Sequence, residues 1–319
     1  MQILVFGKDG QLGKAFKGLF DSLTFLQKVE VQYVGRGQCD LANSAALTEF
    51  LDQSNADLII NASAYTAVDK AETEADLAFA VNARAPEIMA QYTAKHGATF
   101  LHYSTDYVFD GEKYGFYLED DVRNPLSVYG KSKAAGEDAV ARVFVNSIAG
   151  QYAIFRTSWV YGDGGNFIRT ILRLAKEREE LKIIADQYGV PTSADWLAKV
   201  SLHLALNPQG ELNAFPSGTY HAVPDGETTW HGLAICAARV ALEMGMGLKA
   251  HPDAIKAIQA VEYPVSAPRP MNSRMSTDKL QSVLAASNSY NDLVKGQGFP
   301  HWEIMVREYV QKLAAAGLA

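Results

Sequence analysis

The chain has 319 residues, of which 48% are hydrophobic and 20% are charged. These proportions are typical of a soluble globular protein with enough core to fold without disulfide bonds. The formal net charge of -7 argues against a nucleic-acid binder, which usually carries a basic surface. The two cysteines, Cys39 and Cys236, are far apart and lack metal-ligand spacing, which predicts two reduced thiols.

The chain begins with an apolar run that leads straight into a glycine turn, so the sequence predicts no signal peptide ahead of the fold. The most apolar later stretch, around residues 233–248, contains Arg239 and Glu243 and falls short of a membrane span. We therefore expect a cytoplasmic protein whose partners include neither a membrane nor nucleic acid.

The first half of the chain alternates short apolar runs with segments of helical composition. The expected strands are residues 3–6, 29–34, 58–61, 99–103 and 153–156, and the expected helices follow Gly10 and cover residues 44–53, 75–96 and 129–144. This alternation predicts an α/β fold with a doubly wound parallel sheet, the Rossmann architecture.

The second half is less regular. Helical patterns cover residues 167–180, 194–206 and 230–246, and the charged end of the first has the composition of a solvated face. Residues 264–272 contain three prolines and predict an irregular segment. We expect residues 1–163 to form a dinucleotide-binding domain, to which the chain returns around residues 192–225. Residues 164–319 are expected to form mainly a smaller C-terminal substrate-binding domain.

Gly7, Gly10 and Gly13 form a Gly-x-x-Gly-x-x-Gly run directly after the first expected strand. In this position, backbone amides and a helix N-terminus can hold the pyrophosphate of a dinucleotide. Gly7 permits a tight turn, Gly10 lets the backbone approach the phosphates, and Gly13 allows close packing of the helix. A glycine turn without a ligand is the alternative, but the strand before it and the helical pattern after it favour a dinucleotide.

The end of the second expected strand bears on the choice of cofactor. An NAD-preferring site usually offers a carboxylate there to the ribose 2′-hydroxyl. This strand instead ends in Tyr33-Val-Gly35-Arg36, and a guanidinium suits the 2′-phosphate of NADP. We therefore expect NADPH to be preferred over NADH. Asp40, a few residues further on, could hydrogen-bond the adenine amino group.

Tyr129 and Lys133 lie four residues apart in an expected helix, so both side chains can reach one pocket. A tyrosine has an ordinary pKa of about 10, and a nearby ammonium group lowers it by stabilising the phenolate. Thr105 follows an expected strand at the edge where doubly wound sheets bind ligands. Alone, the tyrosine and lysine would be surface residues. With the glycine turn and Thr105 they predict a catalytic set for hydride transfer.

With these residues in place, the chain resembles the extended short-chain dehydrogenase/reductase superfamily and, more narrowly, the dTDP-4-dehydrorhamnose reductases. The resemblance covers essentially the whole chain and rests on seven blocks. These are Gly7-Lys-Asp-Gly-Gln-Leu-Gly13, Asn61-Ala-Ser-Ala-Tyr-Thr-Ala-Val-Asp69, His102-Tyr-Ser-Thr-Asp-Tyr-Val-Phe-Asp110, Tyr129-Gly-Lys-Ser-Lys133, Phe155-Arg-Thr-Ser-Trp-Val-Tyr161, Asp186-Gln-Tyr-Gly-Val-Pro-Thr192 and Arg269-Pro-Met-Asn-Ser-Arg274. The first and fourth occur widely in the superfamily, whereas the third, fifth, sixth and seventh together are specific to this reductase group.

The resemblance implies which residues bind the cofactor. Its pyrophosphate would be held by Gly10, Gln11 and Leu12, its adenine would meet Asp40 and Leu41, and Tyr103 would lie near the nicotinamide. The other implied or expected cofactor residues are Gly7, Arg36, Ala64, Tyr65, Thr66, Tyr129 and Lys133.

The resemblance also implies which residues meet a dTDP-sugar substrate. Thr105, Asp106 and Trp159 would contact the sugar, alongside the catalytic Tyr129. A tryptophan suits this role because its face can stack on the C–H bonds of a hexose. The alternative for Trp159 is a core tryptophan after a strand. Arg269, in the proline-rich segment, is a candidate for the diphosphate.

Two departures from the family pattern carry consequences. Members often have an acid at the end of the second strand, and Gly35-Arg36 stands there instead, which argues against an NADH preference. Some members dimerise through a magnesium ion held by glutamates, one of them in the first helix. Here Lys14-Ala15 follows Gly13, so we predict no metal, and either a monomer or a homodimer.

The implied function is reduction of the C4 keto group of dTDP-6-deoxy-L-lyxo-4-hexulose, or dTDP-4-dehydro-L-rhamnose, to dTDP-L-rhamnose. Another nucleotide-sugar 4-keto reductase or an epimerase would share this fold, because function lies in the site and not in the fold. A non-catalytic regulatory subunit is an alternative of a different class. Such a subunit should tolerate loss of the tyrosine and lysine, and this chain keeps both.

Overall fold

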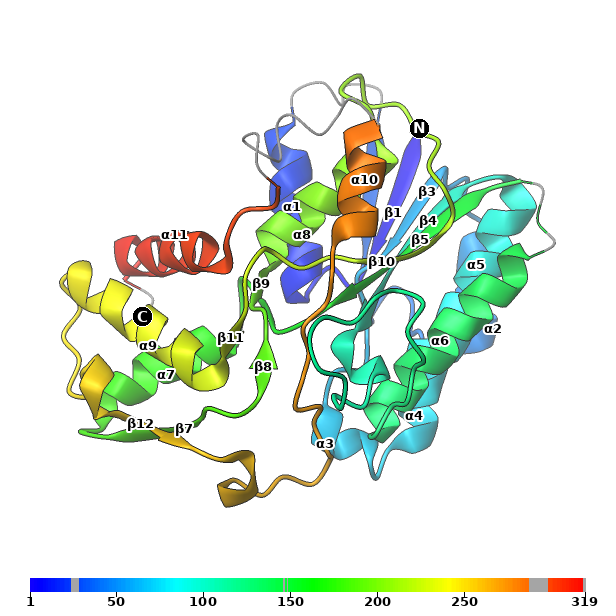
Figure 1. The fold of residues 1–319 in the computed structure, drawn as a ribbon. Helices are drawn as coiled ribbons and strands as arrows, with labels where there is room; N and C mark the ends of the chain where they lie inside the picture. Colours follow the sequence, from blue (N-terminus) through cyan, green and yellow to red (C-terminus); the bar gives the residue numbers. More distant parts are fainter. Residues whose placement is uncertain (24–28, 146, 148, 287–297, 318–319) are drawn as a thin grey trace.

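The computed structural model describes residues 1–23, 29–145, 147, 149–286 and 298–317. Its centre is a parallel six-stranded sheet with the strand order β10-β5-β4-β3-β1-β2 (Figure 1). The strands are β1 (Gln2–Phe6), β2 (Glu30–Val34), β3 (Leu58–Asn61), β4 (Thr99–Thr105), β5 (Gln151–Thr157) and β10 (Gly218–His221). The predicted α/β fold with a doubly wound sheet is confirmed, and all five expected strands are present.

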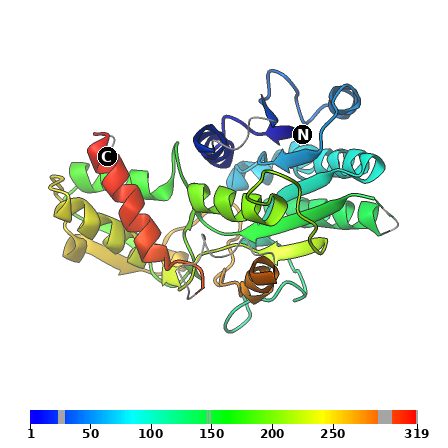
Figure 2. The same ribbon diagram turned by 90° about the horizontal axis from the view of Figure 1, so that it is seen from above.

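Helices cover both faces of this sheet because its strands are apolar on both sides (Figure 2). One face packs against α1 (Gln11–Ser22) and α8 (Ala194–Ala205). The other face packs against α2 (Ser44–Asp52), α5 (Ala85–His96) and α6 (Val128–Phe144). Each fully buried side chain of leucine or phenylalanine size contributes about 1.5–3 kcal/mol. These two layers therefore fix the ends of the strands where the site lies.

The single helix expected over residues 75–96 is interrupted. It consists of α4 (Ala75–Phe79), a π-helical turn (Ala80–Arg84) and α5, and the short α3 (Val68–Ala71) precedes it. Such π turns insert an extra residue into a helix and are frequent at functional sites. The helical periodicity of the sequence does not reveal this turn, because one inserted residue shifts the pattern by less than a third of a turn.

A second lobe contains α7 (Phe167–Glu177), α9 (Trp230–Glu243) and α11 (Trp302–Ala315). Short strand pairs lie beside these helices: β7 (Leu181–Ile184) with β12 (Ile255–Ile258), β8 (Tyr188–Gly189) with β11 (Thr228–Thr229), and β6 (Val160–Tyr161) with β9 (Thr192–Ser193). Short 3₁₀ turns cover Asp106–Val108, Pro252–Ala254 and Ala260–Glu262. The expected helix over residues 167–180 ends earlier, at Glu177, because β7 begins at Leu181.

Two later elements pack on the first lobe. Helix α8 lies against α1, and β10 adds to the sheet edge beside β5, so residues between 192 and 225 contribute to one helix layer and to the sheet itself. Helix α10 (Asp278–Ala286) packs near β10. The domain limits 1–163 and 164–319 themselves stay a prediction.

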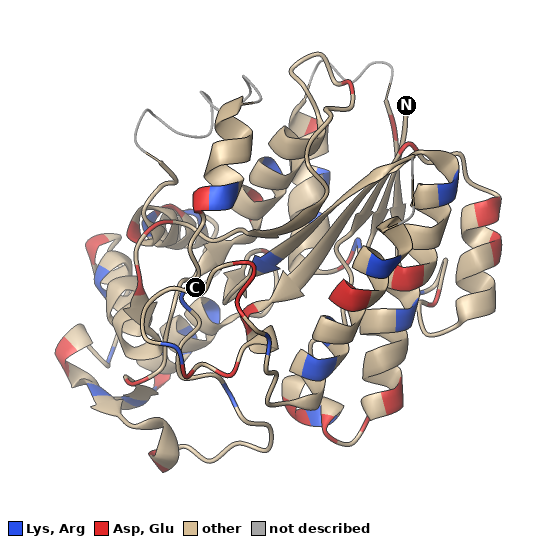
Figure 3. Ribbon diagram, turned by 45° about the vertical axis from the view of Figure 1, so that its right-hand side comes forward, with Lys and Arg blue, Asp and Glu red and all other residues tan. Residues whose placement is uncertain are grey.

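The outer helices carry acidic and basic residues interspersed along their exposed faces (Figure 3). Residues 264–272 form neither a helix nor a regular strand, as their prolines predict. No helix in the described part of the chain combines the length and the apolar character that crossing a membrane requires.

Candidate active site

A cavity of about 520 Å³ lies at the carboxyl ends of β1, β2 and β3. Strands β2 and β3 flank β1 on opposite sides, so the connections after β1 and β3 diverge here, which is where doubly wound sheets bind ligands. Nine of the residues expected to bind a cofactor line this cavity. They are Gly7, Gly10, Gln11, Leu12, Arg36, Asp40, Leu41, Ala64 and Thr66.

The glycine turn is shaped by close backbone contacts. Gly7 has a φ of 83°, and a Cβ on it would lie 2.7 Å from the Ala62 carbonyl oxygen. A Cβ on Gly13 would lie only 2.1 Å from the Gly7 carbonyl oxygen, so the helix can begin this close to the turn only with glycine there. Gly10 is the N-cap of α1 and has no side-chain capping bond. The turn thereby places the N-terminal end of α1, with residues Gly10, Gln11 and Leu12, in the wall of the cavity, and the free backbone amides of a helix N-terminus suit a pyrophosphate.

Gln11 supplies a further sign that the cavity fits a polar ligand. Its side-chain Oε1 is buried without a hydrogen-bond partner among the described residues, whereas its Nε2 lies 3.5 Å from the Val160 carbonyl oxygen. Such unpartnered buried oxygens are uncommon in folded proteins and indicate a missing partner. A bound dinucleotide would supply one.

The outer wall of the cavity was not anticipated from the sequence. Val160, Asp163, Gly164 and Gly165, which follow β5 in the chain, line it opposite the glycine turn. Asp163 also faces Lys14 of α1 at 3.4 Å. The two lobes therefore meet across the cavity at this point. In the sequence, only the glycines of this segment could have indicated that the backbone approaches a ligand there.

The π-helical turn holds the connection that follows β3. Asn82 of that turn accepts a hydrogen bond from the Tyr65 backbone N–H at 2.8 Å and donates to the Tyr65 carbonyl at 3.0 Å. It also donates to the Ser132 hydroxyl in α6 at 3.0 Å. Asn82 is buried and thus ties the cofactor loop to the helix that carries Tyr129. Tyr65 itself points its hydroxyl away, toward Glu74.

Thr105, Tyr129 and Lys133 come together at the carboxyl end of β4. Thr105 is the last residue of that strand, and Tyr129 and Lys133 lie on one face of α6, which Ser127 caps through the Gly130 N–H. All three side chains are buried, and Lys133 is only 1% exposed. The Lys133 ammonium donates to the Tyr103 carbonyl oxygen at 2.6 Å. The set expected from the sequence is therefore assembled in one place.

The electrostatics of Tyr129 differ from the expectation. Burial raises the pKa of Tyr129, a hydrogen bond to Thr105 opposes this, and the charge of Asp106 raises the pKa further. The lowering that we expected from Lys133 does not prevail, because the phenol is withdrawn from water and the ammonium group points to the Tyr103 carbonyl. Tyr129 is thus protonated at neutral pH, which suits a group that must donate a proton.

Lys133 shows the opposite shift. Burial lowers its pKa to about 8, and the charge of Glu137, one turn further along α6, works against this. Glu137 is itself paired with Arg156 at 2.7 Å and with Arg123 at 3.1 Å. Because two guanidinium groups share this carboxylate, it offsets the desolvation of Lys133 only in part.

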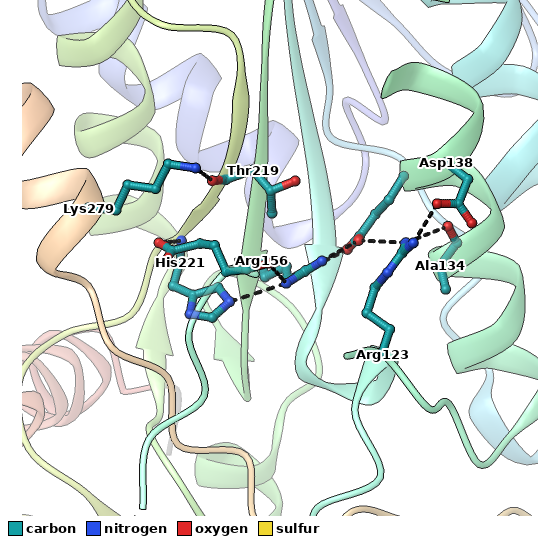
Figure 4. Close-up of polar contacts among 9 residues, drawn as sticks. Arg123, Ala134, Asp138, Arg156, Thr219, His221 and Lys279 are labelled. Carbon is teal, nitrogen blue, oxygen red and sulfur yellow. Dashed lines mark hydrogen bonds and ion pairs between the residues drawn. The ribbon is translucent and has the colours of Figure 1, made fainter. Parts of the chain in front are cut away.

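The arginine network behind Lys133 joins three elements. Arg123, in the segment ahead of α6, reaches to the Ala134 carbonyl and to Asp138, and Arg156 of β5 points toward His221 of β10 on the other side (Figure 4). Burial, followed by the charge of Arg156, lowers the pKa of His221 to about 3, so this histidine is neutral. The network holds α6 against the sheet and thereby sets the positions of Lys133 and Tyr129 relative to the end of β4.

Comparison with known proteins decides the family. The sequence model described as "RmlD substrate binding domain" matches residues 1–297. The dTDP-4-dehydrorhamnose reductase of Shigella flexneri is 39% identical over 317 residues, which are 98% of each chain. The chain belongs to this reductase family. It is an oxidoreductase.

Solved structures of family members have the same fold. The dTDP-4-dehydrorhamnose reductase of Clostridium acetobutylicum has a TM-score of 0.82 and 32% identity, covering 98% of this chain and 99% of that one. The Bacillus anthracis reductase, determined in complex with NADP, has a TM-score of 0.81 and 29% identity over the same shares of the two chains. The family resemblance inferred from the seven sequence blocks is therefore confirmed.

In this member of the reductase family, the Tyr103 side chain lies away from the cofactor cavity. Its ring stacks on Phe155 with a centroid distance of 5.5 Å and lies 6.3 Å from the Phe16 ring, within the core between the sheet and α1. Tyr103 takes part in the site through its backbone carbonyl, which holds Lys133. Strand alternation explains this, because neighbouring positions point to opposite faces.

Trp159 lies where β5 gives way to β6 and has a left-handed backbone, with a φ of 48°. It is the one such non-glycine residue in the described part of the chain. Backbone strain of this kind is concentrated at functional sites. The indole stacks on Trp230 at 3.8 Å between ring centroids and touches Gly189, where a Cβ would lie 2.6 Å from the ring. Trp159 is half-buried, so part of it stays accessible to a sugar.

Arg269 already has an anionic partner. Its guanidinium forms a two-armed ion pair with Asp69 of α3, at 2.9 and 2.7 Å, and Asp69 also accepts the Ala267 N–H. The hydrogen bond to Arg269 lowers the pKa of Asp69 to about 2. This pair ties the proline-rich segment to the first lobe beside the loop of Tyr65. A diphosphate contact at Arg269 stays a prediction.

Proposed function

We propose that the chain reduces the C4 keto group of dTDP-6-deoxy-L-lyxo-4-hexulose to dTDP-L-rhamnose, with NADPH as the preferred hydride donor. One observation carries the proposal: Thr105, Tyr129 and Lys133 meet at the end of β4, the strand next to β3, and the end of β3 helps to form the cavity lined by the expected cofactor residues, in a chain of this reductase family. The lobe formed mainly by residues 164–319 would bind the sugar nucleotide. The protein would act in the cytoplasm, as a monomer or a homodimer.

In the proposed reaction, the cofactor supplies a hydride to C4 of the sugar. Tyr129, kept protonated by burial, donates its proton to the oxygen that gains charge. Lys133, held by the Tyr103 carbonyl, lies on the same face of α6, where it can hydrogen-bond the nicotinamide ribose. Donors held in place ahead of the reaction stabilise the developing alkoxide without reorganisation.

Thr105 would contact the same oxygen. In the structure its hydroxyl proton goes to Asp106 at 2.8 Å, which leaves the Thr105 oxygen within hydrogen-bond reach of Tyr129 beside the reacting oxygen. Trp159, which is half-buried and stacked on Trp230, would contact the hexose with the part of its indole that stays exposed.

The assay that tests this function follows oxidation of reduced nicotinamide by its near-ultraviolet absorbance. Purified protein is mixed with the dTDP-4-keto sugar and with NADPH or NADH in separate reactions. We expect oxidation that depends on the sugar, with NADPH the better cofactor. Cofactor binding without any oxidation of either form would contradict the proposed reaction.

The NADPH preference rests on Arg36, which lines the cavity at the end of β2. The Lys8 side chain and the Asp9 carboxylate both lie against Gly35, since a Cβ on that glycine would lie 2.8 Å from Lys8 Cε and from Asp9 Oδ2. Lys8 and Asp9 are paired with each other at 2.8 Å, so they largely offset each other's charge. The Arg36 guanidinium is therefore the group that would meet the negative charge of a 2′-phosphate.

Replacing Arg36 with alanine should therefore weaken NADPH selectively. We expect the KM for NADPH to rise roughly tenfold, the effect of losing one charge-assisted hydrogen bond, and the KM for NADH to change less than about twofold. Steady-state kinetics with each cofactor measure this. Arg173→Ala, which removes an exposed arginine paired with Glu177 on α7, is the matched control. Equal effects on both cofactors would contradict a 2′-phosphate contact at Arg36.

A further inference from the structure

The segment of residues 271–276 leads from the second lobe to α10 (orange in Figure 1) and passes between β8 and the loop that contains Tyr117. Backbone bonds hold it on both sides: the Ser273 N–H donates to the Tyr188 carbonyl of β8 at 2.8 Å, and the Arg274 carbonyl accepts from Tyr117 at 2.8 Å. The buried Asn272 amide donates to the Lys113 and Gly115 carbonyls. These bonds leave Ser273 little freedom to move.

From this fixed position the Ser273 hydroxyl reaches a carboxylate 167 residues earlier in the chain. It donates to Asp106 Oδ2, while Asp106 Oδ1 accepts the Thr105 hydroxyl proton at 2.8 Å. The Thr105 hydroxyl oxygen also accepts the Tyr107 N–H at 3.2 Å. Ser273, Asp106 and Thr105 are 3%, 2% and 6% exposed, so water does not compete for these bonds. They form a continuous chain from the second lobe to the hydroxyl beside Tyr129.

The charge on Asp106 is sensitive to this arrangement. Burial raises its pKa to about 6, and the hydrogen bonds from Ser273 and then Thr105 act against that rise. The titratable groups that face it are the phenols of Tyr107, in the 3₁₀ turn after β4, and of Tyr129, on α6. Both phenols stay protonated across the neutral range. The ionisation of Asp106 in this range thus depends on its hydrogen-bond donors, among which the Ser273 and Thr105 hydroxyls have a larger effect than the backbone N–H groups of Asp106 and Tyr107.

We propose that Ser273 is a positioning residue for the reduction: its hydroxyl holds the ionised Asp106 carboxylate, and this carboxylate holds the Thr105 hydroxyl against Tyr129. The inference rests on the proposed function of the same site. It gives the 271–276 segment a role in catalysis that requires no contact between Ser273 and the substrate.

The physical reason is that a buried threonine hydroxyl can rotate unless its proton has one strong acceptor. An ionised carboxylate is such an acceptor, because charge-assisted hydrogen bonds are about twice as strong as neutral ones. When Asp106 becomes protonated it loses this preference and can donate in place of accepting. Turnover should therefore fall as the pH drops through the Asp106 pKa, on an acid limb centred at about 6.

The test is the pH profile of kcat for Ser273→Ala at saturating NADPH and keto sugar. Loss of the donor raises the Asp106 pKa, so we expect the acid limb to move upward by roughly half a unit to one unit. At the pH of the original midpoint this shift lowers kcat by about two- to fivefold, in addition to any change at alkaline pH, where kcat should stay within about threefold of the original chain. KM for NADPH should not change.

Three further variants separate positioning from simple damage to the fold. Ser273→Thr restores a hydroxyl donor and should restore the limb. Asp106→Asn cannot ionise and should lose the limb altogether. Ser276→Ala is the matched control, because that hydroxyl in the same segment bonds Asp278 and not the site. Its profile should match the original chain.

The outcomes are distinct. A uniform loss of kcat in Ser273→Ala, with the limb unmoved, would show a structural role alone and overturn the proposal. If Ser273→Ala does not fold, an unmoved limb in Asp106→Asn overturns it equally. Absence of turnover in the original chain, at every pH, would remove the proposed function and this inference with it.

Discussion

Replacing Tyr129 with phenylalanine is expected to lower kcat by roughly 10²–10⁴-fold, the usual contribution of a positioned general acid. Burial keeps the Tyr129 phenol protonated, and Thr105 lies within hydrogen-bond reach of it. Phenylalanine preserves the ring and its edge-to-face contact with Tyr107, at 5.4 Å between centroids, so the pocket should keep its shape. The loss is therefore expected in kcat and not in binding.

Two measurements distinguish these effects. Single-turnover kinetics should show the slow chemical step, and fluorescence titration of NADPH should give a Kd within about twofold of the original, because phenylalanine removes only one hydroxyl. Tyr114→Phe is the matched control, since that ring is 97% exposed. Turnover in Tyr129→Phe within tenfold of the original chain would contradict the assignment of Tyr129 as the proton donor.

Much of the first lobe could be predicted because its sequence signals are local. The strand of residues 3–6 is apolar on both faces, and Gly7 and Gly13 follow at positions where the backbone contacts permit no side chain. Tyr129 and Lys133 share a helix face through their spacing alone. In each case one short stretch of sequence contains the whole physical constraint.

The rest depends on contacts between distant residues. Asn82 meets Tyr65 only because a π turn rotates it inward, and Ser273 meets Asp106 only because the chain returns from the second lobe. Strand β10 is four residues long, begins with Gly218 and is preceded by Pro216 and Ser217, so its composition does not distinguish it from a loop. No spacing rule in the sequence reports such contacts, and they determine how Thr105 and the cofactor loop are held.

Burying the Lys133 ammonium group is expected to lower the stability of the folded protein. It is fully buried, and burial lowers its pKa to about 8, against about 10.4 for an exposed lysine. Between these values the unfolded chain binds more protons than the folded one, so stability rises with pH across this window. Below the folded pKa the full cost of burying the ammonium is present. The functional charge of Lys133 is therefore expected to destabilise the folded protein at neutral pH.

Lys133→Met should for this reason raise the free energy of unfolding at neutral pH, by on the order of 1–3 kcal/mol, while abolishing most turnover. Thermal unfolding across the pH range measures the first effect and the coupled absorbance assay the second. The stability difference should shrink as the pH rises from about 8 toward the unfolded value, because the lysine becomes neutral in both states. Lys131→Met, at an exposed position on the same helix, should change neither. A lower Tm in Lys133→Met at neutral pH would mean that the bond to the Tyr103 carbonyl outweighs the desolvation of the ammonium, and that Lys133 supports the fold as well as the reaction.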